Sequence, residues 1–285
     1  MIIQKFELAA KDKERNIGIG LGKSEYHNQK ILKASLSFLQ KYKSNLYLFG
    51  TENKINELLE SSHQTNIKSK VKFIECQDPE KSILEFLEKS EIDSIVRGSL
   101  NSNIFLKHLI INLNIKTHNR LALLETINGH QFFYGPVGID ECNNFNEKIA
   151  FLEAAFKELD RIHIVPKTSI LSGGRIGDIG RDAKVDQTIQ DAEKIVKLMK
   201  EKYKDLNISH DEILIEKAVE NKANLIVAPN GISGNLIYRT LVHLGGGKAY
   251  GAIYMGLKKP IIDTSRVGNF SEIYGALILA VALSN

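Results

Sequence analysis

The stretch Ala223–Asn235, ANLIVAPNGISGN, decides the fold class of this chain. Its first part, Asn224–Ala228, is a short apolar run typical of a buried strand, and Pro229 ends that run. An apolar pattern with helical spacing follows from Gly231 to Leu244. A buried strand that passes through a polar loop into a helix is typical of the β–α units of parallel sheets. The stretch therefore predicts an α/β protein.

The same alternation of β-rich runs and helical patterns extends along the rest of the chain. Strands are predicted at 16–22, 46–49, 71–74, 94–96, 121–126, 169–171, 224–228, 252–256 and 261–263, and helices at 26–42, 52–61, 79–89, 104–113, 146–160, 185–202, 212–220, 231–244 and 270–283. Asn128-Gly129 lies between two β-like runs and indicates a hairpin. A change of composition near Pro136 favours a domain junction there. No internal repeat is visible.

Composition excludes several classes of protein. The 285 residues carry 38 basic and 34 acidic side chains, a formal charge of +4, and the lysines are scattered rather than gathered as in a nucleic-acid-binding surface. Cys76 and Cys142 have no disulfide or zinc spacing. The first ten residues are too polar for a signal peptide, and the most apolar tract, 273–283, is shorter than the roughly 20 residues that span a bilayer. We expect a cytoplasmic protein with no nucleic-acid partner, no membrane partner and no metal.

Loops after predicted strands are the candidate ligand sites, because ligands of open parallel sheets bind beyond the carboxyl ends of the strands. Gly18-x-Gly20-x-Gly22-Lys23 completes neither a dinucleotide fingerprint nor a P-loop, and a tight turn is favoured over phosphate contact. Arg97-Gly98-Ser99 follows another strand. Arg97 could hold an anion or form an ion pair, and the sequence favours neither.

The loop that begins at Ser172-Gly173-Gly174-Arg175 precedes a long predicted helix. Glycines let backbone N–H groups approach phosphate oxygens, and arginine supplies positive charge, so a functional contact is favoured here.

The two C-terminal loops give the strongest indication of a site. Ser265 and Arg266 follow the last predicted strand, and Glu272 lies in the first turn of the closing helix. This set could supply a hydrogen bond, a phosphate contact and a base. The competing interpretation is a helix cap followed by acidic residues that the helix dipole favours. Together the loops give these candidate substrate-binding residues: Arg97, Ser99, Ser172, Gly173, Gly174, Arg175, Asn230, Ser233, Asn235 and Thr264.

Several of these residues form motifs that resemble a known family. Pro229, Gly234-Asn235-x-x-Tyr238-Arg239, Gly256-Leu257-x-Lys259-Pro260 and Asp263-x-Ser265-Arg266 are similar, in order and spacing, to the end of the phosphate acetyl/butyryltransferases. Ser172–Arg175 falls where that family has a serine-rich loop. The run Pro229–Leu236 and the glycines at 245–247 resemble more narrowly the methanogen proteins labelled methyltransferase-related subunit X (MtxX), a divergent branch of the same superfamily.

The resemblance implies an isocitrate-dehydrogenase-like fold of two α/β domains with an interdomain cleft. Residues 1–130 with 258–285 would form the first domain, 131–257 would form the second, and a homodimer would be usual. It also implies acyl transfer between an acyl phosphate and the thiol of coenzyme A, with no bound cofactor.

By position in the family motif, Arg266 would hold the phosphate, Ser265 would stabilise developing charge, and Glu272 would act as the base. The family usually has aspartate at the last position, so the extra methylene of Glu272 moves its carboxylate by roughly 1–1.5 Å. Two alternatives stay open on the same fold. One is a methyltransferase-related or cofactor-linked role in methanogenesis, and the other is non-catalytic binding of a phosphorylated metabolite.

Overall fold

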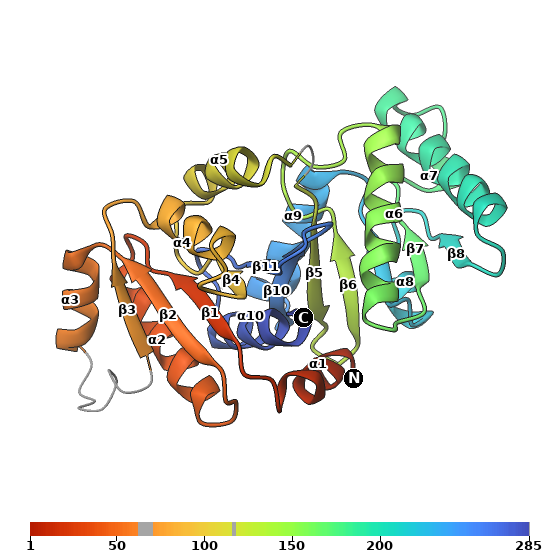
Figure 1. Ribbon diagram of the computed structural model, residues 1–285. Coiled ribbons are helices and arrows are strands. Elements are labelled where there is room, and N and C mark those ends of the chain that lie inside the picture. Colours follow the sequence, from red (N-terminus) through yellow and green to blue (C-terminus); the bar gives the residue numbers. More distant parts are fainter. Residues whose placement is uncertain (62–70, 116–117, 285) are drawn as a thin grey trace. The chain divides into compact units, whose positions relative to one another are not determined.

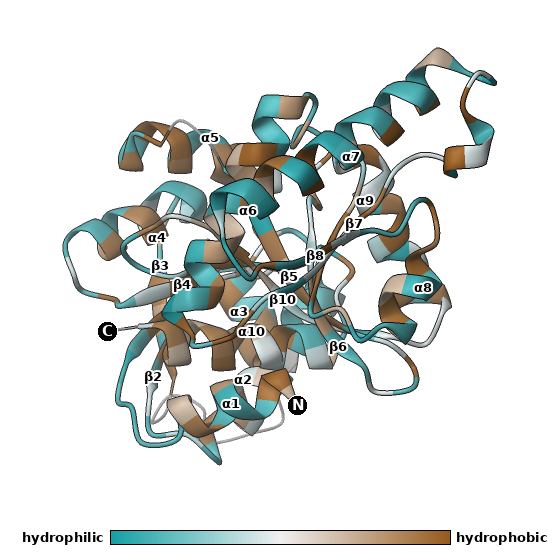
Figure 2. Cartoon of the chain, turned by 90° about the vertical axis from the view of Figure 1, so that its right-hand side faces the viewer, coloured by the Kyte–Doolittle hydropathy of each residue, from teal (hydrophilic) through white to brown (hydrophobic). Residues whose placement is uncertain are grey.

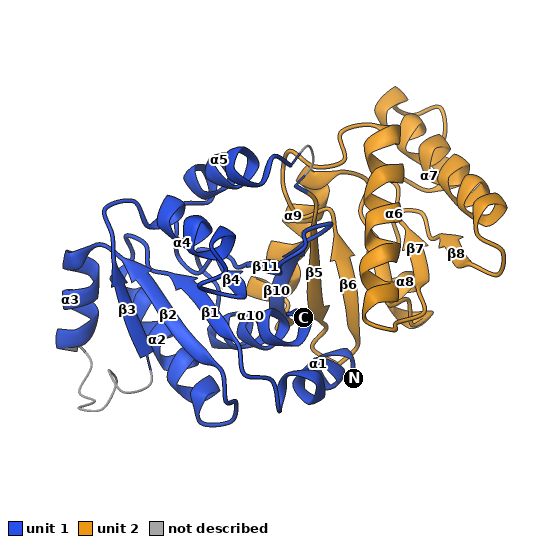
Figure 3. Ribbon diagram, viewed as in Figure 1, with its two compact units in different colours: residues 1–118, 249–285 blue, residues 119–248 orange. Residues whose placement is uncertain are grey.

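A computed structural model describes residues 1–61, 71–115 and 118–284 of the chain. It divides into two compact units, Met1–His118 with Ala249–Asn285 (unit 1) and Asn119–Lys248 (unit 2), shown in Figure 3. The predicted boundaries were 130/131 and 257/258. The observed ones fall earlier because both strands of the central hairpin belong to unit 2, and because the strand that follows Lys248 pairs within unit 1.

Unit 1 contains a mostly parallel sheet (Figure 1). Its strands lie in the order β3 (Val71–Glu75), β2 (Asn45–Gly50), β1 (Asn16–Gly20), β4 (Ser94–Val96), β11 (Ile261–Asp263) and β10 (Lys248–Tyr254). Neighbours from β3 to β11 pair in parallel, and only β10 runs antiparallel, to β11. The carboxyl ends of β1, β4 and β11 therefore lie at one edge.

The helices of unit 1 are α1 (Ile2–Ala10), α2 (Glu25–Leu39), α3 (Glu52–Ser61), α4 (Pro79–Glu88), α5 (Ser102–Leu113) and α10 (Phe270–Leu283). Side-chain caps begin three of them. Ser24 begins α2, Asp78 begins α4 with proline in the first turn, and Asn101 begins α5. Helix α10 is buried along most of its length, as its apolar sequence predicted.

Unit 2 has strand order β5 (Arg120–Glu125), β6 (Gln131–Gly135), β9 (Leu225–Val227), β7 (Lys167–Ile170) and β8 (Asn207–His210). Strands β5 and β6 form the predicted antiparallel hairpin, and Gly129 in its turn has a φ of +81°. The other neighbours pair in parallel, so β6, β9, β7 and β8 end at a common edge.

The helices of unit 2 are α6 (Phe145–Arg161), α7 (Ala183–Lys202), α8 (Ile215–Glu220) and α9 (Gly231–Arg239), with a 3₁₀ turn at Ile176–Asp178 and a π-helical turn at Thr240–Leu244. Helix α7 alternates hydrophilic and hydrophobic residues, as expected of a helix with one buried face (Figure 2).

The α/β class is as predicted, and two elements were missed. Helix α1 buries Ile3, Phe6 and Ala10, a helical spacing in a segment for which the sequence predicted no helix or strand. Strand β8 is four residues long and buries only Ile208, too little to give a strand pattern. Across the residues that the structure describes, no helix is both long enough and apolar enough to span a membrane.

Candidate functional site

Three loops meet at the carboxyl edge of the unit 1 sheet. The N–H of Ser99 donates to the carbonyl of Gly20 (3.1 Å), which ties the loop after β4 to the end of β1. The Ser99 hydroxyl accepts the N–H of Gly22 (2.6 Å) and donates to Oδ1 of Asn28 (2.6 Å). A Cβ on Gly22 would lie 1.9 Å from the carbonyl oxygen of Ser99. The glycine-rich turn therefore packs closely against the backbone of Ser99, and the hydrogen bonds of the Ser99 hydroxyl hold the turn in place.

Arg97 joins the loops after β4 and β11. Its side chain is 3% exposed, and its three nitrogens donate to the Asp263 carboxylate, the Thr264 carbonyl and the Leu100 carbonyl, the last at 2.5 Å. The Thr264 hydroxyl donates back to the carbonyl of Gly98 (2.9 Å). Of the two roles that the sequence left open, the structure shows the ion pair, and it is buried rather than on the surface.

The loop between β11 and α10 brings Ser265 and Glu272 together. The N–H of Ser265 donates to Oε1 of Glu272 (2.7 Å), and the Ser265 carbonyl accepts the N–H of Gly268 (3.0 Å). Glu272 is only 2% exposed, and a Cβ on Gly268 would lie 2.5 Å from its Oε2. The carboxylate is therefore held under the loop, in the first turn of α10.

Arg266 lies on the same loop and is exposed. Within the described ranges it forms no ion pair, and the same is true of the exposed Lys23 in the loop after β1. Strands β1 and β11 both pair with β4, so these loops begin about 10 Å apart. This edge thus carries two exposed cations above a network of buried hydrogen bonds, which suits an anionic ligand.

His27 lies beneath this edge, in the first turn of α2. It is 2% exposed, and burial, assisted by the charges of Lys30 and Arg97, lowers its pKa to about 4. The imidazole is therefore neutral at physiological pH. It is packed in the fold.

In unit 2, the predicted glycine-rich loop follows β7. The Ser172 hydroxyl donates to the carbonyl of Gly174 (2.8 Å) and lies 2.8 Å from Nε2 of His210, at the end of β8. Burial is the main cause that lowers the pKa of His210. Ser172 itself is 1% exposed, so its hydroxyl shapes the turn instead of facing solvent.

The next residues of this loop differ in exposure. The N–H of Gly173 donates to the hydroxyl of Thr188 in α7 (2.8 Å), which fixes the loop on that helix. Arg175 is exposed, its N–H donates to Asp178 (2.9 Å), and within the described part of the chain its guanidinium has no ion-pair partner. Of this loop, Arg175 is the side chain best placed to meet a ligand.

Asn230, Ser233 and Asn235 hold the start of α9 in place. Oδ1 of Asn230 accepts the N–H of Ser233 (2.9 Å), a helix N-cap, and the Ser233 hydroxyl donates to the Asn230 carbonyl (3.0 Å). Nδ2 of Asn235 donates to the carbonyl of Val137 (2.8 Å). All three side chains thus make structural contacts within unit 2.

The glycines of the same motif allow close packing. A Cβ on Gly231 would lie 1.7 Å from the carbonyl oxygen of Gly138, and one on Gly234 would lie 1.9 Å from that of Pro136. The start of α9 therefore lies directly against the backbone that follows β6. This explains why the motif needs glycine at two positions three residues apart.

An ion pair that the sequence did not indicate fixes this backbone. Nε of Arg120 donates to Oε1 of Glu141 (2.6 Å), and Oε2 of the buried Glu141 accepts the N–H of Val137 (3.2 Å). The two charged residues are 21 positions apart, so no local pattern could pair them. Among the described residues, no group of three or more His, Cys, Asp or Glu side chains could hold a metal ion.

Comparison with known proteins shows the family to which the sequence of this chain is similar. A family model described as Phosphate acetyl/butaryl transferase matches residues 21–281. A protein of Methanosarcina barkeri named methyltransferase mtx subunit X is 40% identical over 220 residues, which are 77% of this chain and 79% of that protein. The sequence resemblance is thereby confirmed.

Two solved structures bear on the fold. EutD phosphotransacetylase from Staphylococcus aureus has a TM-score of 0.70 at 16% identity, over 99% of this chain and 97% of that one. Isocitrate dehydrogenase from Methylococcus capsulatus has a TM-score of 0.55 at 11% identity, over 93% and 85%. The expected isocitrate-dehydrogenase-like fold class is confirmed.

Proposed function

This chain belongs to the Phosphate acetyl/butaryl transferase family, and from that premise we propose that it transfers an acyl group between an acyl phosphate and a thiol such as coenzyme A. The observation that carries the proposal is the loop after β11. There the backbone N–H of Ser265 donates a hydrogen bond to Oε1 of Glu272 at 2.7 Å. The next residue, Arg266, is exposed and has no ion-pair partner among the described residues.

Arg266 binds the phosphate group of the substrate. A guanidinium presents donors in a planar fork that fits two phosphate oxygens at once. Its neighbour Ser265 has a half-buried side chain whose hydroxyl accepts the N–H of Val267 at 3.3 Å. This leaves the hydroxyl proton free to donate to charge that develops on the carbonyl oxygen in the transition state.

Glu272 takes the proton of the thiol. The thiolate then attacks the carbonyl carbon, a C–S bond forms, the C–O bond to phosphate breaks, and the proton passes to the departing phosphate. The hydrogen bond from the Ser265 N–H orients the carboxylate, and Gly268, whose Cβ position would lie 2.5 Å from Oε2, leaves that side of the carboxylate without a side chain. Coenzyme A is a substrate in this scheme, and the chain needs no resident cofactor.

Within unit 2, we propose Arg175 and the backbone of the loop after β7 as contacts for an anionic group. Ser172 shapes that loop, and Asn230, Ser233 and Asn235 hold the start of α9, through the hydrogen bonds described above. In unit 1, the loops after β1, β4 and β11 are supported in the same way by Arg97, Ser99 and Thr264. A homodimer, as the family resemblance implies, is part of the proposal.

A second candidate function has one specific observation in its favour. The Methanosarcina barkeri relative, at 40% identity, is named a methyltransferase subunit. A methyl-transfer or cofactor-linked role on the same fold would use the anion-binding edge of unit 1 without acyl transfer. Binding of a phosphorylated metabolite without turnover is a third reading of the same edge.

Thioester formation by the purified protein from coenzyme A and a panel of acetyl, propionyl and butyryl phosphates separates these functions. We expect turnover with at least one acyl phosphate, and its loss in Glu272→Gln, because glutamine can still accept the Ser265 N–H but cannot take a proton. If the wild type gives no thioester with any member of the panel, or if Glu272→Gln turns over as fast as the wild type, the proposed mechanism is wrong.

A further inference from the structure

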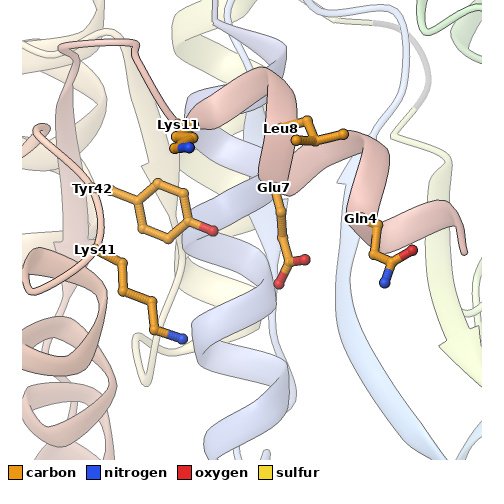
Figure 4. Close-up of a pocket in the computed structure, with 6 residues that line it drawn as sticks. All are labelled: Gln4, Glu7, Leu8, Lys11, Lys41 and Tyr42. Carbon is orange, nitrogen blue, oxygen red and sulfur yellow. The ribbon is translucent and has the colours of Figure 1, made fainter.

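A pocket lined mostly by polar residues lies in unit 1, between α1 and the residues that follow α2 (Figure 4). Its volume is about 470 Å³, within the range of small-molecule sites. The side chains that line it are Gln4, Glu7, Leu8, Lys11, Lys41 and Tyr42. None of these residues belongs to the loops after β1, β4 and β11.

Three charged groups line this pocket without neutralising one another. Within residues 1–61, 71–115 and 118–284, neither Glu7 nor Lys11 nor Lys41 forms an ion pair at 4 Å or less. The pocket thus keeps a carboxylate and two ammonium groups apart. Groups of opposite charge held around an open space can be bridged by a ligand that carries both a charge and a polar substituent.

Tyr42 and Tyr274 hold part of this arrangement in place. The Tyr42 hydroxyl points into the pocket beside Glu7 (Figure 4), and the Tyr42 ring stacks on Phe38 with 4.5 Å between centroids. Burial, Tyr274 and the Glu7 carboxylate all raise the pKa of Tyr42, so the phenol stays protonated. The Lys41 ammonium lies 5.8 Å from the centre of the Tyr274 ring, a cation–π contact. Two polar groups of the pocket are therefore positioned before any ligand arrives.

Two ammonium groups select an anion. With the Glu7 carboxylate they leave one positive charge among the side chains, while the carbonyl ends of α1 and α2, beside Lys11 and Lys41, each oppose it by about half a charge through the helix dipole. An anion is therefore held by direct contact with the two ammonium groups and not by the summed charge of the pocket. A lysine ammonium contacts phosphate or carboxylate oxygens as a point charge, without a fixed geometry.

We propose that this pocket binds the phosphate or carboxylate group of a small metabolite, with Lys11 and Lys41 as the cationic contacts and Glu7 as acceptor for a hydroxyl or amino group of the same molecule. The site is separate from the loop that holds Arg266. It stands or falls independently of acyl transfer.

Isothermal titration calorimetry with inorganic phosphate and with succinate tests the proposal. The parent protein carries Arg266→Ala, so that the phosphate contact proposed for the β11–α10 loop is removed. Lys11→Ala/Lys41→Ala is compared with Lys5→Ala/Lys33→Ala, which removes two exposed lysines of α1 and α2 that do not line the pocket. Both pairs lower the charge by two, and equal melting temperatures would show that both fold.

We expect the parent and the Lys5/Lys33 variant to bind at least one of the two anions, and the Lys11/Lys41 variant to bind it roughly tenfold or more weakly, since two charge-assisted contacts are lost. Binding of phosphate alone, or of succinate alone, supports the site and identifies the oxyanion. If the parent binds neither, or if the Lys11/Lys41 variant binds as tightly as the Lys5/Lys33 variant, the proposal is wrong.

Discussion

Asp263→Ala is expected to destabilise unit 1 far more than an ordinary surface substitution. Arg97 is 3% exposed and donates to the Asp263 carboxylate, so the change leaves a buried guanidinium without its counter-charge. Removing one partner of a buried pair costs about 3–5 kcal/mol. At roughly 2–4 °C per kcal/mol for a chain of this size, the melting temperature should fall by about 6–20 °C.

Scanning calorimetry measures this fall, with Glu85→Ala as the control. Glu85 pairs with Lys81 on the exposed face of α4 at 3.5 Å, and its loss should cost about 0.5 kcal/mol or less. A melting temperature for Asp263→Ala equal to that of Glu85→Ala would refute the structural role of the buried pair. A stable Arg97→Ala variant with weakened phosphate binding would instead favour Arg97 as an anion clamp.

Three further predictions concern the backbone, the pH dependence and the base. Gly231→Ala should destabilise unit 2 by about 1–3 kcal/mol, because the new Cβ would lie 1.7 Å from the carbonyl oxygen of Gly138. Gly177→Ala is the control and should leave stability unchanged, because its Cβ would have no atom within 4 Å. Equal midpoints of the two variants in urea unfolding would contradict the packing described. The pKa of His27 is about 4 in the native state and 6.5 in the unfolded chain, so the unfolded chain binds the proton first as the pH falls, and the free energy of unfolding should decrease by about 3 kcal/mol from pH 6.5 towards pH 4. Urea unfolding across that range should show a shallower decrease for His27→Gln. An equally steep decrease in the variant would contradict this account. Glu272→Asp should shift the carboxylate by roughly 1–1.5 Å and reduce turnover in a thioester assay about a hundredfold, with little change in stability. Unchanged turnover would mean that the position of this carboxylate does not limit the rate.

Much of the fold was predictable because local signals agree with one another. The strand–loop–helix pattern at 224–244 and the Asn128-Gly129 turn each report a structure that neighbouring residues largely determine. Strand β8 and helix α1 were missed because β8 buries one residue and the helical spacing of α1 rests on only three buried residues. The domain boundaries depend on which strands pair, and this is not written in the local sequence.

The candidate site was less predictable, because burial and partners decide what each polar residue does. The sequence pattern placed Ser265 after the last strand and Glu272 in the first turn of the closing helix, and in the structure a hydrogen bond from the Ser265 N–H joins the two. Arg97 and Arg266 each follow a strand, yet one is 3% exposed with three nitrogens engaged and the other is exposed. Contacts such as Arg120 with Glu141 join distant parts of the chain and leave no sequence pattern.

The most direct test of the central claim is kcat/KM for an acyl phosphate in wild type, Arg266→Ala and Arg161→Ala, with coenzyme A as the acceptor. Arg161 is an exposed arginine at the end of α6 and serves as a matched control. The account predicts that Arg266→Ala lowers kcat/KM by roughly a hundredfold or more, as expected when a charge-assisted contact to the transferred phosphate is lost, while Arg161→Ala equals wild type. Equal values for all three proteins would contradict the claim that Arg266 holds the phosphate.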